Sequence, residues 1–454
     1  MNRWVSDRNL NKKIWVVAIP IIIQNLIDAA VNSVDVLMLN YVGQSAISAV
    51  SLANSMIGIF FMFLYGIGTG IAMLAAQYYG KGDLKTIEKI EGIGLKFALL
   101  VVLIGAAGAF FIPSHLMRIY TNDEALVAIG ARYLFYFAPG LIFWAVSAVY
   151  MSILRCIGKV MISTALEATA LVCNVTLNAV FIFGLFGAPR LGVVGVAIAT
   201  ASSRLIQFIG CVVVSLYLKP GVPLTFATVF ARYRILEHDF FVMAMPAIGN
   251  DLVWSLAFSV YAMILGHMGD DAVAAYSIVN VVRNLGTVMC YGIGSASGII
   301  VGQILGEGNR NEGIKAGHAC LRLSVVTGII GGLIVLALMP VTFRLVSLRE
   351  TALDYLKFML LINIYYVLGT AVNTTLIAGV FRAGGDSRFG FMCDLIDMWV
   401  YAVPLGLIAA FVLKLPVKWV YFLLCTDEFV KWPWVFKRFY SYKWAQNITR
   451  EETD

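Results

Sequence analysis

The chain contains a long series of apolar stretches, each of about 20 or more residues, separated by short polar segments. A helix of this length crosses the hydrocarbon core of a bilayer and satisfies its own backbone hydrogen bonds there. The stretches lack the alternation of apolar and polar residues that an outer-membrane β-barrel requires. We therefore predict an all-α membrane protein with twelve transmembrane helices, near residues 14–39, 46–77, 92–112, 126–154, 161–184, 192–218, 239–265, 272–301, 317–343, 352–380, 388–413 and 416–436. The last is the least regular, because Asp427 and Glu428 interrupt it.

Composition and charge agree with a membrane location. Hydrophobic residues make up 60% of the 454 residues and charged residues only 13%, which lies far outside the range of soluble globular proteins. Lys and Arg gather in the two tails and the even-numbered connections, so we expect a multi-pass protein of the plasma (inner) membrane with both termini cytoplasmic. The net charge of +7 follows from these basic loops. No nucleic-acid partner is expected; the expected partners are the lipid bilayer and a small-molecule substrate, and the expected state is a monomer.

An internal repeat divides the chain into two similar halves. Gly43–Gly82 aligns without a gap with Gly269–Gly308, and twelve of the forty positions are identical. The same offset pairs Pro20 with Pro246. We predict an N-lobe at residues 1–218, a cytoplasmic linker at 219–238 and a C-lobe with a cytoplasmic tail at 239–454. Because each lobe contains six spans, the lobes are expected to be related by a pseudo-two-fold axis along the membrane normal, with a cleft between them that opens alternately to either side. A duplicated static scaffold is the alternative.

Polar residues inside the first half mark a candidate cation-coupling site. Asn25, Asp28, Asn32 and Asp35 follow one face of the first span, and Asn174 and Asn178 lie one turn apart in the fifth. A charged side chain at the bilayer centre costs about 2.5–3.5 kcal/mol, so Asp35 is a functional candidate. Together with Asn174, Asn178 and Thr200 it offers the oxygen ligands that Na⁺ prefers, or it could itself carry a proton. Hydrogen bonding between helices is the alternative role of the two amides.

Proline 20 precedes this polar face and is a candidate hinge. A proline inside a helix removes one backbone hydrogen bond and favours a kink. A kinked first span could bend when Asp35 changes charge. A packing kink without movement is the alternative interpretation.

The second half distributes its polar residues differently. At the positions of Asn25, Asp28 and Asp35 it carries Asp251, Trp254 and Tyr261. Asp251 and Arg283 are expected either to form a buried ion pair or to serve a substrate or ion site. We include Asp28, Asn32, Asp251, Trp254, Tyr261 and Arg283 among the candidates for lining a substrate cleft.

Three other acidic residues inside the apolar stretches are not assigned to the coupling site or to the substrate cleft. Asp394 and Asp397 lie close to the start of the eleventh stretch, so we interpret them as hydrated acids at a helix end. Glu167 has no obvious partner in the sequence. The seven cysteines occur singly, mostly inside spans, and are interpreted as small buried apolar residues.

Motifs for catalysis and for ATP binding are lacking in the sequence. No G-x-x-x-x-G-K-[ST] phosphate-binding loop occurs, and the four histidines are dispersed without metal-ligand spacing. We therefore expect no enzyme activity and no cofactor other than a coupling ion, H⁺ or Na⁺. A polytopic membrane transferase is the least favoured function, since it would need a catalytic histidine or acidic cluster at a membrane face.

Several motifs together resemble the multidrug and toxic compound extrusion (MATE) family. They run in order along nearly the whole chain: VDVLMLNYVGQSAISAVSLANS, AQYYGKGD, RCIGKV, NVTLNAVFIFG, PRLGVVGVAIATASSR, FRAGGDSRF and DMWVYAVPLG. The resemblance implies an antiporter that exports amphipathic, often cationic, organic compounds in exchange for H⁺ or Na⁺. It also implies that Asp35 is the coupling carboxylate, surrounded by Asn174, Asn178 and Thr200, and that Pro20 marks a bending point.

The resemblance is incomplete at two places. Asn178 stands where some archaeal-type members carry a second aspartate. In the C-lobe, Asp251 lies about one turn before the glutamate of NorM-type members, and Ala371 and Asn373 lie near the place of their second acid. An exporter or flippase of a lipid-linked or anionic metabolite is the alternative function, which would require several unpaired basic residues in the cleft; Arg204 and Arg283 are the candidates.

Overall fold

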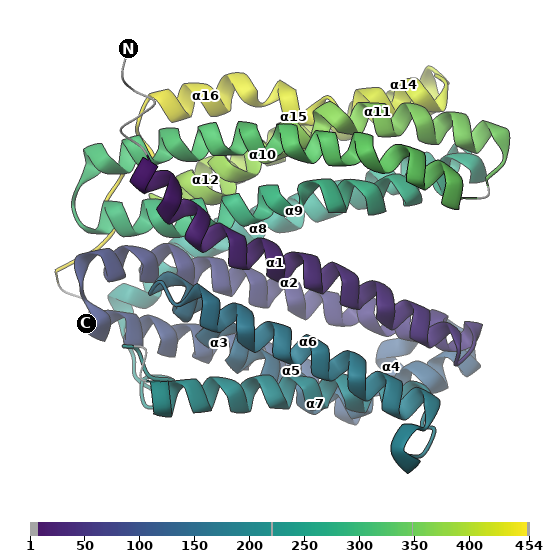
Figure 1. The fold of residues 1–454 in the computed structure, drawn as a ribbon, viewed down its shortest axis with the longest axis horizontal. Helices are drawn as coiled ribbons and strands as arrows, with labels where there is room; N and C mark the ends of the chain where they lie inside the picture. The colour runs from purple at the N-terminus through teal and green to yellow at the C-terminus, as the bar shows by residue number, and fades with distance from the viewer. Residues whose placement is uncertain (1–7, 219–220, 347, 452–454) are drawn as a thin grey trace. The chain divides into compact units, whose positions relative to one another are not determined.

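The computed structural model describes residues 8–218, 221–346 and 348–451, and the described chain is helical without any strand (Figure 1). Eleven helices of this described part are long and apolar enough to cross a membrane. The twelfth predicted span is instead a series of three short helices, α14 (Val417–Leu424), α15 (Asp427–Val430) and α16 (Trp432–Tyr440). Asp427 and Glu428 begin the middle one, which is where the sequence pattern was interrupted.

The described chain separates into two compact units. The N-terminal unit comprises Ile23–Tyr79, Asp83–Phe240 and Glu451, and the C-terminal unit comprises residues 8–22, Gly80–Gly82 and Phe241–Arg450. One division therefore falls inside the first helix, two residues after Pro20.

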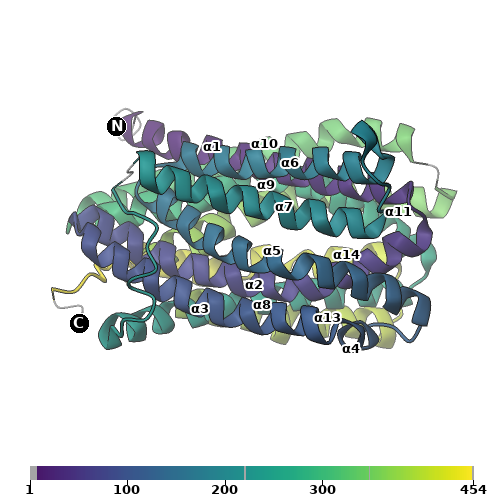
Figure 2. The same cartoon turned by 90° about the horizontal axis from the view of Figure 1, so that it is seen from below.

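The N-terminal unit is built from the helices of the first half. α5 packs against α3 and α7, and α6 packs against α7 (Figure 2). The elements of the first half are α1 (Arg8–Asn40), α2 (Gln44–Lys81), α3 (Leu84–Phe111), α4 (Pro113–Arg118), α5 (Glu124–Cys156), α6 (Val160–Phe183), η1 (Leu185–Gly187), α7 (Val193–Val213) and η2 (Val214–Leu218). All belong to the N-terminal unit except the beginning of α1, up to Ile22, and the last two residues of α2.

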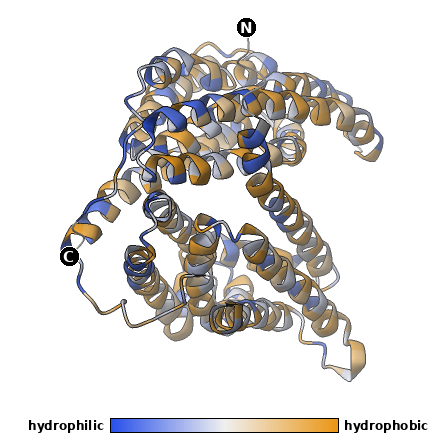
Figure 3. Cartoon of the chain, turned by 60° about the vertical axis from the view of Figure 1, so that its left-hand side comes forward, coloured by the Kyte–Doolittle hydropathy of each residue, from blue (hydrophilic) through white to orange (hydrophobic). Residues whose placement is uncertain are grey.

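The C-terminal unit begins with long helices and ends in a series of short helical segments. Its elements are α8 (Arg234–His267) from Phe241 onward, α9 (Asp270–Gly306), α10 (Arg310–Leu345), α11 (Glu350–Asn373), η3 (Thr374–Phe381), α12 (Ser387–Asp394), η4 (Leu395–Ala402), α13 (Val403–Leu407), η5 (Ile408–Val412) and α14 to α16. The segments η3, η4 and η5 are π-helical. Hydrophobic residues predominate along the helices (Figure 3).

The internal repeat appears in the backbone as well as in the sequence. Gly43 and Gly269, which precede α2 and α9, have φ angles of +131° and +128°. Gly82 and Gly308, which follow the same two helices, have φ angles of +80° and +82°. These left-handed conformations favour glycine, so the repeat conserves the residue that its two turns need.

Glycines also allow helices of the C-terminal unit to approach closely. A Cβ atom on Gly331 of α10 would lie 2.4 Å from the carbonyl oxygen of Gly286 in α9. Close backbone contact of this kind is how small residues contribute to packing inside membranes, where burial of apolar surface gives little driving force.

Candidate functional site

Three of the four predicted coupling residues form one hydrogen-bonded chain in the N-terminal unit. Asn178 donates from Nδ2 to Oδ1 of Asn174 at 3.3 Å, and Asn174 donates from Nδ2 to the Thr200 hydroxyl at 3.2 Å. Both asparagines are buried. The hydroxyl of Thr200 in turn donates to the carbonyl of Val196 in its own helix at 2.9 Å. The bond between Asn174 and Thr200 joins α6 to α7 inside an apolar bundle.

The acid assigned to this site lies on a part of α1 whose side chains are not described. Asp35 and Asn32 belong to that helix, but their side chains lie outside the described residues. Their roles therefore remain predictions. α1 continues as one helix through Pro20, which is buried, and the hinge also remains a prediction.

A second polar group of the N-terminal unit gives Glu167 the partner that the sequence did not reveal. Arg204 lies 3.1 Å from Oε1 of Glu167, and Gln207 donates to Oε2 of the same carboxylate at 2.6 Å. The Arg204 guanidinium also lies 5.1 Å from the centre of the Trp144 ring. Asp28, which is half-buried, lies within electrostatic range of both Glu167 and Arg204. An ion pair and a hydrogen bond therefore join α6 and α7.

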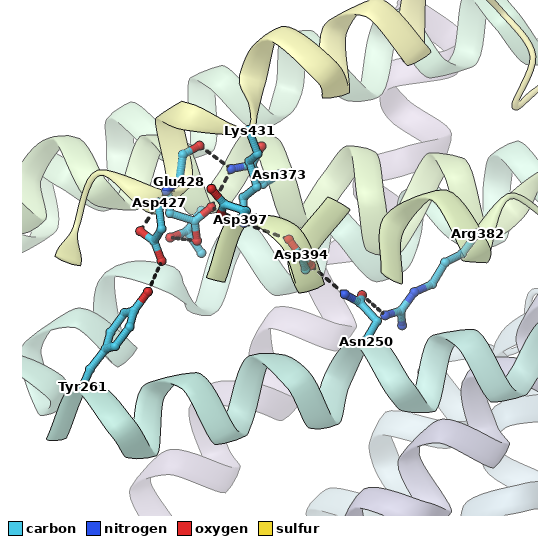
Figure 4. Close-up of polar contacts among 10 residues, drawn as sticks. Asn250, Tyr261, Asn373, Arg382, Asp394, Asp397, Asp427, Glu428 and Lys431 are labelled. Carbon is cyan, nitrogen blue, oxygen red and sulfur yellow. Dashed lines mark hydrogen bonds and ion pairs between the residues drawn. The ribbon is translucent and has the colours of Figure 1, made fainter. Parts of the chain in front are cut away.

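Among the described residues, the largest concentration of buried charge lies in the C-terminal unit. The Nζ atom of Lys431 lies 3.0 Å from Asp394, 3.4 Å from Glu428 and 3.7 Å from Asp397 (Figure 4). Asp427 is the fourth buried acid, next to Glu428 in α15. We call Asp394, Asp397, Asp427, Glu428 and Lys431 the acidic cluster.

Neighbouring side chains donate hydrogen bonds to three of the four carboxylates of the acidic cluster. Asn250 donates to Asp394 at 2.6 Å, and the Tyr261 hydroxyl donates to Asp427 at 3.2 Å. Glu428 accepts from the Asn373 amide and, at 3.2 Å, from the Thr370 hydroxyl. Asp397 has no hydrogen-bond donor for either oxygen in the part of the chain that the structure describes.

The interpretation of Asp394 and Asp397 as hydrated helix-end acids was wrong. Both are buried, with Asp397 fully so. Asp394 is the last of the eight residues of α12, two turns inside the span, and Lys431 reaches it from the junction of α15 and α16. The segmented end of the chain, α14 to α16, thus supplies Lys431, Asp427 and Glu428 to the interior of this unit.

The expected pair of Asp251 and Arg283 does not form. Asp251 instead pairs with Arg382 at 2.8 Å, and Arg382 also donates to Asn250 at 2.8 Å. The Arg283 guanidinium lies 4.8 Å from the centre of the Phe258 ring and 5.8 Å from that of Tyr366. No ion pair to Arg283 is found among the described residues. Its guanidinium interacts with the faces of aromatic rings and not with a carboxylate.

The two aromatic cleft candidates lie in the core of the C-terminal unit. Tyr261 is buried, and Trp254 packs 4.4 Å from Phe258, ring centre to ring centre. Tyr261 and Arg283 border a cavity about the size of one water molecule, with Tyr276, Tyr366 and Tyr421 among its other walls.

The described part of the chain contains no group of three or more His, Cys, Asp or Glu side chains arranged to hold a metal ion. All seven cysteines are free, and six of them are buried. The amide and hydroxyl oxygens of Asn174, Asn178 and Thr200 suit a small hard cation only if a carboxylate joins them.

Comparison with known proteins gives consistent results. The MatE family model matches residues 20–180 and 246–408, one segment in each half. The chain is 26% identical over 435 residues to the probable multidrug resistance protein YoeA of Bacillus subtilis, covering 91% of this chain and 90% of that protein. It is also 26% identical over 414 residues to a probable multidrug resistance protein NorM of Bradyrhizobium diazoefficiens, covering 87% of this chain and 85% of the relative. A crystal structure of a MATE protein in complex with MaL6 superimposes with a TM-score of 0.86 at 19% identity, over 96% of this chain and 97% of the other.

Proposed function

Since the chain belongs to the MatE family of membrane transporters, we propose that it is a secondary antiporter that exports amphipathic, cationic organic compounds in exchange for H⁺ or Na⁺. The family consists of transporters and not of enzymes, which removes the membrane transferase from consideration. The relatives named as multidrug resistance proteins support multidrug efflux. In this proposal the two lobes alternate between an outward and a cytoplasmic opening, and both termini are cytoplasmic.

The hydrogen-bonded chain of Asn174, Asn178 and Thr200 is the observation that carries the proposal. A polar chain inside lipid-embedded helices is costly unless it is satisfied, and this one joins α6 to α7. In the proposed mechanism, Asp35 approaches these groups and is neutralised by the entering cation. Neutralisation removes the cost of a buried charge, and α1 then bends near Pro20 and changes which side of the transporter is open.

The alternative of a flippase for an anionic or lipid-linked cargo receives less support. That function would need unpaired basic residues to hold the anion. Arg204, one of the two candidates, is paired with Glu167 at 3.1 Å. Arg283 is the remaining candidate, and its guanidinium packs against the rings of Phe258 and Tyr366.

Efflux of ethidium from proteoliposomes tests the proposal. The purified full chain would be assayed under an imposed H⁺ gradient and, separately, under an imposed Na⁺ gradient. We expect one gradient to drive efflux and Asp35→Asn to abolish it, because the amide cannot change charge. Asp270→Asn is the control, since Asp270 is an exposed acid at the start of α9, and it should transport like the wild type.

Two results would contradict the proposal in different ways. Ethidium movement that depends on neither gradient would exclude cation-coupled antiport. Equal coupled efflux by the wild type and by Asp35→Asn would leave antiport in place and remove Asp35 as the coupling residue.

A further inference from the structure

The acidic cluster carries more negative charge than its single lysine can balance. Asp394, Asp397, Asp427 and Glu428 are all buried, and Lys431, 2% exposed, is the cation among them. Burying an uncompensated charge is strongly unfavourable even after relaxation. The cluster therefore favours the uptake of further positive charge.

The position of Lys431 decides which kind of positive charge can enter. Its ammonium group lies within 4 Å of three of the four acids, at 3.0, 3.4 and 3.7 Å, and so occupies the place that a bound metal ion would take. A second cation such as Na⁺ would be repelled by the ammonium at short range. A proton can bind to one carboxylate without displacing the lysine.

The hydrogen bonds indicate which carboxylate accepts that proton. Hydrogen bonds donated to a carboxylate favour its ionised form. Asp394 accepts such a bond from Asn250. Asp427 accepts from the Tyr261 hydroxyl and from the backbone N–H of Glu428. Glu428 accepts from Asn373 and Thr370. Asp397 receives none from the described residues and is 0% exposed, so its ionised form is the least stabilised of the four.

We propose that Asp397 is a proton-binding residue of the C-terminal unit and that Lys431 is the fixed counter-cation of its site. The titratable and charged groups that face Asp397 are Tyr261 on α8, Cys393 and Asp394 on α12, Asp427 and Glu428 on α15, and Lys431. The site depends on neither the Asp35 side chain nor a metal ion. Its part in transport rests on the proposed function, because a proton bound here would add to the coupling at Asp35.

The local backbone is suited to such a role. Asp397 lies in η4, a π-helical segment of eight residues between α12 and α13. π-Helical turns are rare and occur frequently at functional sites. Oδ2 of Asp397 lies 3.7 Å from Nζ of Lys431, which belongs to the last, segmented part of the chain. Loss of the proton would strengthen the attraction of Asp397 for Lys431 and draw the two segments together.

Infrared difference spectroscopy of the purified full chain tests proton binding directly. A protonated carboxylic acid has a carbonyl stretch that is separate from the bands of carboxylates. We expect wild-type protein at neutral pH to show this band, Asp397→Asn to lose it, and Asp394→Asn, the matched control in the same cluster, to keep it. The amide is nearly isosteric with the neutral acid and adds no buried charge, so this variant should fold; Asp397→Glu, which retains an acid, should keep the band at a shifted position.

The outcomes separate the site from the transport mechanism. A band that persists unchanged in Asp397→Asn, or that disappears equally in Asp394→Asn, would overturn the assignment. A band that disappears when NaCl replaces choline chloride would show that the site binds Na⁺, which contradicts the proposed role of Lys431. Because the spectrum requires no transport, a failure of ethidium efflux would refute the proposed function without affecting this measurement.

Discussion

The Nζ atom of Lys431 lies 3.0 Å from Oδ1 of Asp394, and this ion pair is almost completely buried. It joins the junction of α15 and α16 to the end of α12. Because both side chains are buried, water cannot replace the partner of the ammonium or of the carboxylate group. The pair therefore fixes the segmented end of the chain to the interior of the C-terminal unit.

The first prediction concerns the loss of this lysine. Lys431→Met should lower the free energy of unfolding by about 3–5 kcal/mol, because removing one partner of a buried ion pair leaves an uncompensated charge. Thermal and denaturant unfolding of the purified protein in detergent would measure the change. Lys418→Met is the matched control: Lys418 pairs with Asp354 at 2.6 Å, but the two side chains are 31% and 57% exposed.

The control should change stability by no more than about 1 kcal/mol, as is typical of exposed ion pairs. In the background of Asp394→Asn, the effect of Lys431→Met should become smaller, because one negative charge has already been removed. Equal losses for the two lysine variants would mean that the buried cluster contributes no more than a surface pair.

The second prediction compares two arginines as partners of Asp251. A double-mutant cycle of Asp251→Asn and Arg382→Gln should give a coupling energy of about 0.5–3 kcal/mol, the range found for residues in direct contact. The cycle of Asp251→Asn and Arg283→Gln should give about zero within the usual error of 0.3–0.5 kcal/mol for independent sites. Unfolding of the two single variants and the double variant provides each cycle. A larger coupling to Arg283 than to Arg382 would contradict the contact at 2.8 Å.

The main features of the fold could be predicted from the sequence because they depend on local properties. Apolar length determines which segments can cross a membrane, and the repeat preserves its glycines at the turns that need a positive φ. The pairing of Asn174 with Asn178 also followed from their spacing of one helical turn. Each of these depends on residues close together in the chain or on a repeated pattern.

The charged clusters could not be predicted from local sequence patterns of this kind. Glu167 and Arg204 are 37 residues apart on different helices, and no sequence period relates them. The acidic cluster draws on α12, η4 and α15, and its lysine lies in the stretch that was the least regular of the predicted spans. A signal was nevertheless present: all five residues of the acidic cluster lie in two consecutive apolar stretches. The cost of exposing so many charges to lipid would have favoured their mutual burial.

The third prediction tests how the segment between the two halves is attached to the N-terminal unit. Part of this segment packs on α3, where the Thr228 hydroxyl donates to the carbonyl of Glu88 at 3.3 Å. A Cβ atom on Gly92 would lie 2.3 Å from the Thr228 hydroxyl oxygen and 2.8 Å from its backbone carbonyl carbon. A side-chain rotation cannot relieve the second contact. Gly92→Ala must therefore move the segment away from α3.

We expect Gly92→Ala to cost about 1–3 kcal/mol of stability, the usual effect of overpacking, and to increase hydrogen exchange in residues 225–231. Gly58→Ala is the control, because a Cβ atom on Gly58 of α2 meets nothing within 4 Å. Replacing a glycine inside a helix by alanine without a clash should raise stability by about 0.5–1 kcal/mol. Unchanged exchange in residues 225–231 of Gly92→Ala would show that this segment is not held against α3. A loss of stability in both variants would instead point to a general intolerance of alanine in these helices.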